Sequence, residues 1–213
     1  MAKAKNSSSR RWLRQHERDP YVQASRREGY RSRASYKLLE LDRAYRLFRP
    51  GQTVVDLGAT PGGWSQVAVQ KIAPGGRLFA CDLLPMADIP GVTFLQGDFT
   101  ETEALSVLLD ALGDARVDVV ISDMAPNMSG MRGVDQPRAI YLVELALEFA
   151  ARVLKPGGIF VAKVFQGEGS DQLLGVARKQ FTRVLVRKPD ASRQESREVY
   201  WVASGHRATT PSE

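Results

Sequence analysis

Hydrophobic and polar positions along this chain follow two periodicities, one typical of helices and the other of buried strands. The first clear helix shows in four apolar residues spaced three or four apart, Leu38, Leu41, Tyr45 and Phe48. This spacing predicts an amphipathic helix over residues 34–48. Further helices are predicted in the same way at 64–72, 101–112, 134–154 and 170–180. Between them, short apolar runs bounded by glycine, proline or aspartate predict strands at 53–56, 77–81, 92–96, 117–122 and 159–164.

The alternation of strands with helices predicts the fold class. Strands that read as continuous valine and isoleucine runs are typical of a parallel sheet whose two faces are both covered. The last two strands, at 182–187 and 197–203, have only a loop between them and should pair as an antiparallel hairpin. We therefore expect an α/β protein with a mostly parallel seven-stranded sheet, one antiparallel strand and helices on both faces.

Positive charge is concentrated at one end of the chain. Residues 1–33 hold ten lysine or arginine residues and three acidic ones, a net charge of +7, and the other 180 residues sum to −1. Trp12, Tyr21 and Tyr30 lie among the arginines. Such a segment indicates a polyanionic partner or, alternatively, a solvated tail, and without an apolar face it does not suit a membrane surface. The chain is thus divided into a basic, partly flexible arm (1–33) that would bind a polyanion such as RNA, a single domain (34–204) and a flexible tail (205–213).

The small number of cysteine and histidine residues excludes several classes of site. Cys81 is the only cysteine, and His16 and His206 are the only histidines. A disulfide framework, a zinc site and a serine–histidine–aspartate triad therefore do not fit, and no metal is expected. No apolar stretch approaches the roughly 18 residues of a transmembrane helix, and no signal peptide is evident. We expect a soluble, cytoplasmic monomer.

The best-marked segment is the glycine-rich turn DLGATPGGW, residues 56–64, which follows the first strand. Its glycines, Gly58, Gly62 and Gly63, permit close approach of a ligand to the backbone, although a tight strand-to-helix connection would also use them. Asp56 would repel a pyrophosphate but suits a cofactor that carries an amino group and a sulfonium. Pro61 removes one backbone donor from a phosphate cradle. These features favour S-adenosylmethionine over the alternative, a nicotinamide dinucleotide.

Acidic residues also follow the next two strands. Asp82 is placed to accept hydrogen bonds from ribose hydroxyls, and Asp98 from an adenine amino group. Either acid alone is more simply a loop residue or a helix cap. Together with Asp56, however, they place three acids at the carboxyl ends of three successive strands, the edge where open α/β sheets bind ligands.

Four motifs carry a resemblance to a known family: DLGATPGGWSQ, SDMAPNMSG (122–130), KVFQGEG (163–169) and SRQESREVYWV (192–202). They resemble the FtsJ/RrmJ family of large-subunit ribosomal RNA 2′-O-ribose methyltransferases, which have a Rossmann-like methyltransferase fold. The resemblance covers the chain from about residue 26 to residue 203.

This resemblance implies S-adenosylmethionine as the cofactor and a set of residues that contact it. The contacts it implies are Gly62, Trp64, Asp82, Asp98 and Asp123. Neighbouring positions complete the candidate cofactor set, namely Asp56, Gly58, Gly63, Leu83 and Phe99. It further implies a catalytic group made of Lys37, Asp123, Lys163 and Glu198.

The resemblance also implies a substrate. In bacterial members this is a uridine in the peptidyl-transferase region of large-subunit rRNA, within an assembled or assembling large ribosomal subunit. Relatives act on tRNA anticodon loops or mRNA caps, so a tRNA anticodon loop is the alternative target. A non-catalytic RNA-binding module is the alternative of another class.

One candidate residue is unusual even when the family resemblance is set aside. Lys163 lies in the apolar strand at 159–164, and lysine is almost never buried unpaired. A strand-end lysine that reaches out to solvent would be the ordinary explanation. A mere binding module has no need of such a residue. In a 2′-O-methylation Lys163 would accept the hydroxyl proton, or would stay charged and orient the hydroxyl while Asp123 accepts the proton.

Overall fold

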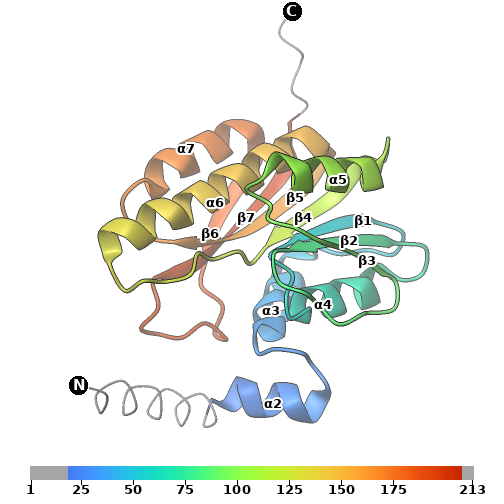
Figure 1. The fold of residues 1–213 in the computed structure, drawn as a ribbon, viewed down its shortest axis with the longest axis horizontal. Coiled ribbons are helices and arrows are strands. Elements are labelled where there is room, and N and C mark those ends of the chain that lie inside the picture. Colours follow the sequence, from blue (N-terminus) through green and yellow to red (C-terminus); the bar gives the residue numbers. More distant parts are fainter. Residues whose placement is uncertain (1–18, 208–213) are drawn as a thin grey trace, which may run out of the picture.

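The computed structural model describes residues 19–207 of the chain, and Figure 1 shows their arrangement. The first part of the predicted arm, with Trp12 and His16, and most of the predicted tail lie outside the described residues. The helices are α2 (Pro20–Glu28), α3 (Ala34–Tyr45), α4 (Gly63–Ile72), α5 (Thr102–Leu112), α6 (Arg132–Val153) and α7 (Ser170–Gln180). The strands are β1 (Thr53–Leu57), β2 (Arg77–Asp82), β3 (Val92–Gln96), β4 (Val117–Ser122), β5 (Leu154–Phe165), β6 (Phe181–Arg187) and β7 (Glu198–His206).

The strands form one seven-stranded sheet in the order β3-β2-β1-β4-β5-β7-β6. Strands β1 to β5 pair in parallel, whereas β7 runs antiparallel to both of its neighbours, β5 and β6. The predicted fold class and hairpin are therefore confirmed. Because β7 lies next to β5 and runs antiparallel to it, the first residue of β7, Glu198, pairs with the last residue of β5, Phe165, at the edge where the parallel strands end.

Two hydrophobic clusters cover the two faces of the sheet. Helices α5, α6 and α7 pack on one face, and α3 and α4 on the other (Figure 1). Successive side chains of a strand point to opposite faces, so Trp201 of β7 joins the first cluster and Tyr200 the second. Tyr200 thereby faces α3, a placement on which the site described below depends.

Helix α2 was not predicted from hydrophobic periodicity, although its start is marked in the sequence. Asp19 caps the helix by accepting a hydrogen bond from the backbone N–H of Tyr21 at 3.0 Å, and Pro20 occupies the first helical position. Gly29 ends it in the left-handed conformation, with φ of 76°. Part of the predicted arm is thus a capped helix.

The first predicted helix is shorter than expected, because α3 ends at Tyr45 rather than at residue 48. Arg46 adopts the left-handed conformation with φ of 52°, and its N–H donates to the carbonyl of Asp42. The Asp42 side chain accepts from the N–H of Phe48 at 3.1 Å, which turns Phe48 into the core. The apolar spacing therefore continues past the helix end. The fifth predicted strand is longer than expected. It begins at Leu154 rather than at residue 159, because the buried Leu154 pairs with Val117 of β4.

Arg46 generates a prediction about stability. Among residues 19–207, it is the one residue other than glycine that has a positive φ. This left-handed conformation costs a residue with a Cβ atom roughly 1–2 kcal/mol. Arg46→Gly removes this cost but adds chain entropy to the unfolded state, so we expect a net stabilisation of about 0.5–1 kcal/mol in urea unfolding. The matched change Ala44→Gly, inside α3, should instead destabilise the protein. Equal effects of the two changes on the free energy of unfolding would contradict the strained conformation of Arg46.

Candidate active site

A cleft of about 660 Å³ opens at the carboxyl ends of β1, β2, β3 and β4. Its walls are the loops after β2, β3 and β4 and one side of α6, with Arg138, Tyr141 and Leu142, and the turn after β1 closes it. Six of the predicted cofactor residues line it: Gly58, Asp82, Leu83, Asp98, Phe99 and Asp123. The structure thus brings together residues that lie up to 65 positions apart, at the edge where the sequence pattern placed them.

The lining of this cleft combines carboxylates with apolar side chains. Asp82 accepts hydrogen bonds from the N–H groups of Thr60 at 2.9 Å and Leu84 at 2.8 Å, which fix its carboxylate at the rim. Asp98 is held likewise by the N–H of Thr100 at 2.9 Å. The Thr100 hydroxyl also donates to the same Oδ1 of Asp98, at 2.7 Å, so the acceptor capacity of Asp98 for a hydroxyl or amino donor lies on its Oδ2, whereas both oxygens of Asp82 retain a lone pair. With Leu83 exposed beside them, the cleft fits a nucleoside: carboxylates for its polar edge and apolar groups for its base.

The glycines of the turn have two different roles in the structure. A Cβ at Gly58 would lie 2.6 Å from Cγ of Met124, so a glycine is needed where the turn meets the loop after β4. A Cβ at Gly63 would lie 2.3 Å from Oγ of Ser32, at the contact between α4 and the start of α3. Gly62 and Trp64 are also buried, and the Trp64 indole N–H donates to the carbonyl of Ala34 at 2.8 Å. Gly63 and Trp64 therefore pack α4 against the start of α3, and Gly62 packs against the loop after β2. The assignment of all three as cofactor contacts stays a prediction.

Asp56 is likewise absent from the lining of the cleft. It is fully buried in β1, where its Oδ2 accepts a hydrogen bond from the Ser65 hydroxyl at 2.6 Å. Its Oδ1 has no hydrogen-bond partner among residues 19–207. The pKa of Asp56 is raised to about 7, mainly by burial and to a smaller extent by the nearby carboxylates of Asp123 and Asp82, against the lowering effect of the Ser65 hydrogen bond. A cofactor amino group near Oδ1 would satisfy this oxygen, so the prediction for Asp56 stays open.

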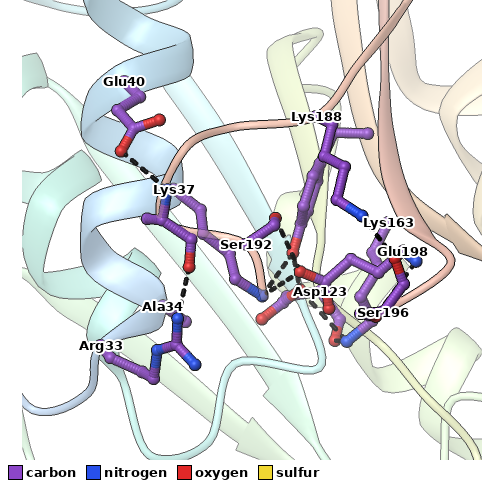
Figure 2. A network of polar contacts seen from close by, with 12 residues as sticks. Arg33, Ala34, Lys37, Glu40, Asp123, Lys163, Lys188, Ser192, Ser196 and Glu198 are labelled. Atoms are coloured by element: carbon purple, nitrogen blue, oxygen red, sulfur yellow. Dashed lines mark hydrogen bonds and ion pairs between the residues drawn. The ribbon is translucent and has the colours of Figure 1, made fainter. Parts of the chain in front are cut away.

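The four predicted catalytic residues form one cluster beside the cleft (Figure 2). Lys37 extends from α3 and its Nζ lies 2.5 Å from Oε1 of Glu198, the first residue of β7. Nζ of Lys163, on β5, lies 3.2 Å from Oδ1 of Asp123 and donates to the Asp123 backbone carbonyl at 2.5 Å. Lys37 and Lys163 are only 8% and 9% exposed. The sequence suggested this convergence, and the structure shows two lysine–carboxylate pairs at one edge of the sheet.

A fifth residue, Tyr200, joins the two ion pairs and was missed in the sequence. Its hydroxyl accepts a hydrogen bond from Lys37 Nζ at 3.0 Å and donates to Oδ1 of Asp123 at 2.9 Å. Burial raises the pKa of Tyr200 well above its usual value, and the charges of Asp123 and Glu198 act in the same direction. The hydroxyl therefore stays protonated and donates a hydrogen bond to Asp123. Its place follows from the register of β7 against β5, which pairs Tyr200 with Lys163.

Asp123 is the residue common to both parts of the site. Its side chain is 20% exposed and lines the cleft, while its carboxylate contacts Lys163 and Tyr200 in the cluster. A ligand in the cleft and a group bound at the lysines would therefore meet at Asp123. Within residues 19–207, no group of three or more histidine, cysteine or acidic side chains is placed to hold a metal ion. In the same range, no helix is long and apolar enough to cross a membrane.

A mostly parallel sheet with a nucleoside-shaped cleft at its carboxyl edge, next to paired lysines and carboxylates, defines a Rossmann-like methyltransferase. The chain belongs to the FtsJ-like methyltransferase family, which it matches over residues 30–206. This match spans every strand of the sheet and all five residues of the cluster.

Similar proteins agree with this assignment over nearly the full length. The chain is 61% identical to ribosomal RNA large subunit methyltransferase E of Hahella chejuensis over 203 residues, covering 95% of this chain and 98% of the relative. The Pseudomonas aeruginosa protein of the same name is 59% identical, with 96% and 99% covered. A crystal structure of a ribosomal RNA methyltransferase from Plasmodium falciparum superposes with a TM-score of 0.75 at 27% identity, covering 83% of this chain and 98% of that one.

The buried Asp56 generates a prediction about pH. Its pKa rises from 3.8 to about 7 on folding, so between these values the folded state binds more protons than the unfolded state. Stability is then lost as the pH rises through this window. Relative to Asp56→Asn, the wild-type free energy of unfolding should fall between pH 4 and pH 7 by on the order of 3 kcal/mol.

Urea unfolding of both proteins at several pH values measures this difference. The exposed change Asp114→Asn serves as the control and should leave the wild-type pH dependence unaltered. A constant difference between wild type and Asp56→Asn from pH 4 to pH 7 would show that Asp56 ionises normally in the folded protein.

Proposed function

We propose that this protein uses S-adenosylmethionine to methylate the 2′-hydroxyl of a uridine in the peptidyl-transferase region of large-subunit rRNA. The single observation that carries the proposal is Asp123, which lines the nucleoside-shaped cleft and also pairs with Lys163 in the catalytic cluster. The names of the most similar relatives support rRNA as the substrate. We further propose that the protein acts in the cytoplasm, as a monomer, on an assembled or assembling large subunit.

The cleft residues bind and orient in this proposal. Asp82 accepts hydrogen bonds from ribose hydroxyls, Asp98 accepts from the adenine amino group, and Leu83 and Phe99 contact the base. S-adenosylmethionine supplies an electrophilic methyl group when it is bound. The remaining task of the protein is to hold a ribose hydroxyl in line with this methyl group and to remove its proton.

The lysine–carboxylate cluster holds the ribose hydroxyl and removes its proton. In one version Lys163, in its neutral form, would accept the hydroxyl proton at Nζ while S-adenosylmethionine supplies the methyl group to the oxygen. Asp123 and the carbonyl behind it fix that atom at the cleft. Lys37 and Glu198, held through Tyr200, orient the RNA ribose and its phosphate. In the competing version Lys163 stays charged and orients the hydroxyl, and Asp123 accepts the proton.

The described part of the basic segment supports an RNA surface on the same side of the molecule. The Arg31 guanidinium donates at 2.6 Å to the carbonyls of Ala87 and Asp88, in the loop that follows β2. Arg33 forms an ion pair with Asp19, the cap of α2. These contacts place α2 at the carboxyl edge of the sheet, where Arg26 and Arg27 are exposed. Arginines in this position suit the phosphates that flank a target nucleotide.

Labelled methyl transfer tests the proposed function directly. Purified large ribosomal subunits, free 23S rRNA and total tRNA, all from cells that lack the gene, are incubated with the protein and labelled S-adenosylmethionine. We expect label in the large subunit, at a 2′-O-methyluridine on mapping. Label in a tRNA anticodon loop alone would establish the alternative target. Absence of label in every RNA would refute the proposal.

The identity of the proton acceptor gives a second prediction. Arginine stays protonated throughout the usable pH range, so Lys163→Arg keeps the charge but removes the base. We expect kcat to fall at least about 100-fold, the usual contribution of a general base. The readout is single-turnover methylation of large subunits from pH 6 to pH 10. Substantial activity in Lys163→Arg, together with inactive Asp123→Asn, would assign the proton to Asp123.

The proposed RNA surface gives a third prediction. Deleting residues 1–25 would cut through α2, so the double change Arg26→Gln and Arg27→Gln is the cleaner test. It should weaken binding to rRNA and reduce the slope of log affinity against log salt by about 1–2, without altering S-adenosylmethionine binding. Arg178→Gln with Arg183→Gln, exposed on α7 and β6, is the matched control. An equal loss in the control would mean that binding reflects net charge alone.

A further inference from the structure

The loop between β6 and β7, residues 188–197, lies against α3 and ends at the catalytic cluster. Although it is a connection between two strands, its centre is buried, with Ala191 at 0% and Ser192 at 5% exposure. Figure 2 shows this segment, here termed the clamp loop, passing across α3 above Lys37. A loop buried in this way needs partners for its backbone polar groups.

Helix α3 supplies these partners from one face. The guanidinium of Arg33, directly before the helix, donates to the carbonyl of Ala191 at 2.5 Å. The carboxylate of Glu40 accepts from two consecutive backbone N–H groups, that of Asp190 at 2.7 Å and that of Ala191 at 3.1 Å. Lys37 lies between Arg33 and Glu40 on the same helical face, because residues four and then three apart lie above one another.

The second half of the clamp loop is closed by its own lysine. Nζ of Lys188 donates to the carbonyls of Gln194 at 3.0 Å and Ser196 at 2.5 Å. The hydroxyl of Ser196 in turn accepts from the N–H of Glu198 at 3.1 Å. Both ends of the loop are thus fixed, one on α3 and the other on the start of β7.

Ser192 transmits this fixed geometry to the site. Its hydroxyl donates to Oε1 of Glu198 at 2.9 Å, the same oxygen that Nζ of Lys37 approaches at 2.5 Å. A glutamate side chain has three rotatable bonds, and one ion pair does not define all of them. Two donors from different directions, one on α3 and one on the clamp loop, do hold a single orientation of the carboxylate.

We propose that Ser192 and Glu40 are positioning residues for the methyl transfer: Glu40 fixes the clamp loop on α3, and Ser192 uses that loop to hold Glu198 against Lys37. This role rests on the proposed function of the Lys37–Glu198 pair. Neither residue lines the cleft, so both act through Glu198 and not on the cofactor.

A kinetic double-mutant cycle tests the role of Ser192. Ser192→Ala removes one of the two donors to Glu198, and we expect kcat on large subunits to fall about tenfold, since hydrogen bonds to a charged group are among the stronger ones. KM for S-adenosylmethionine should not change. In a Glu198→Gln background the same change should cost less than twofold, and Ser192→Thr, which keeps the hydroxyl, should restore most of the activity.

Glu40 is tested separately, so that a folding defect in one variant does not decide the result. Glu40→Gln keeps one acceptor but presents an amide donor to the second N–H group, and kcat should again fall with an unchanged KM for S-adenosylmethionine. Amide hydrogen exchange at Asp190 and Ala191 should become faster, which reports on the loop without any RNA. Ser106→Ala and Glu144→Ala, exposed on α5 and α6, are the matched controls and should behave as wild type.

Two results would overturn the proposal. One is a loss in Ser192→Ala that is equally large in the Glu198→Gln background, because Ser192 would then act elsewhere. The other is wild-type kcat and exchange rates in Glu40→Gln. Failure of the proposed function can be distinguished from failure of this proposal. In the first case the wild-type protein would methylate no RNA. Thermal unfolding of the Ser192 and Glu198 single and double variants would still report the coupling between these two residues.

Discussion

The site depends on two lysine–carboxylate pairs that the Tyr200 hydroxyl joins in a nearly dry environment. Removing four charges from water is costly, and a buried pair is stabilising only when its geometry and additional hydrogen bonds compensate. Here the compensation is visible: Tyr200 accepts from Lys37 and donates to Asp123, and the backbone carbonyl of Asp123 accepts from Lys163. Every charge in the cluster is therefore paired, which keeps the lysines in place before any RNA arrives.

Several elements must be positioned correctly for this cluster to form. Strands β4 and β5 bring Asp123 and Lys163 together as parallel neighbours, and β7 brings Glu198 and Tyr200 because it runs antiparallel beside β5. Helix α3 contributes Lys37 from the face that covers β7. The antiparallel direction of β7 is thus more than a topological detail, since a parallel strand in this place would present its other end to the edge.

The cleft and the cluster divide the chemistry between them. Carboxylates and apolar side chains of the cleft suit an uncharged sugar and base, whereas the lysines suit a hydroxyl and a phosphate. Asp123 belongs to both, so a methyl donor and an acceptor would be brought together there. The basic helix α2 lies at the same edge, tied to the loops after β2 and β6 through Arg31 and Arg33.

The sequence by itself determined the fold class, the order of elements from α3 onward and the edge at which the acids lie, because these follow from short-range periodicity and from the ends of strands. It also singled out Lys163, since a lysine in an apolar strand is unusual. Only the tertiary structure decided that Trp64 packs against α3, that Asp56 is buried beside Ser65, and that Tyr200 joins the two ion pairs. These contacts depend on strand register and on which helix covers which face, and both are set by long-range packing that local patterns do not encode.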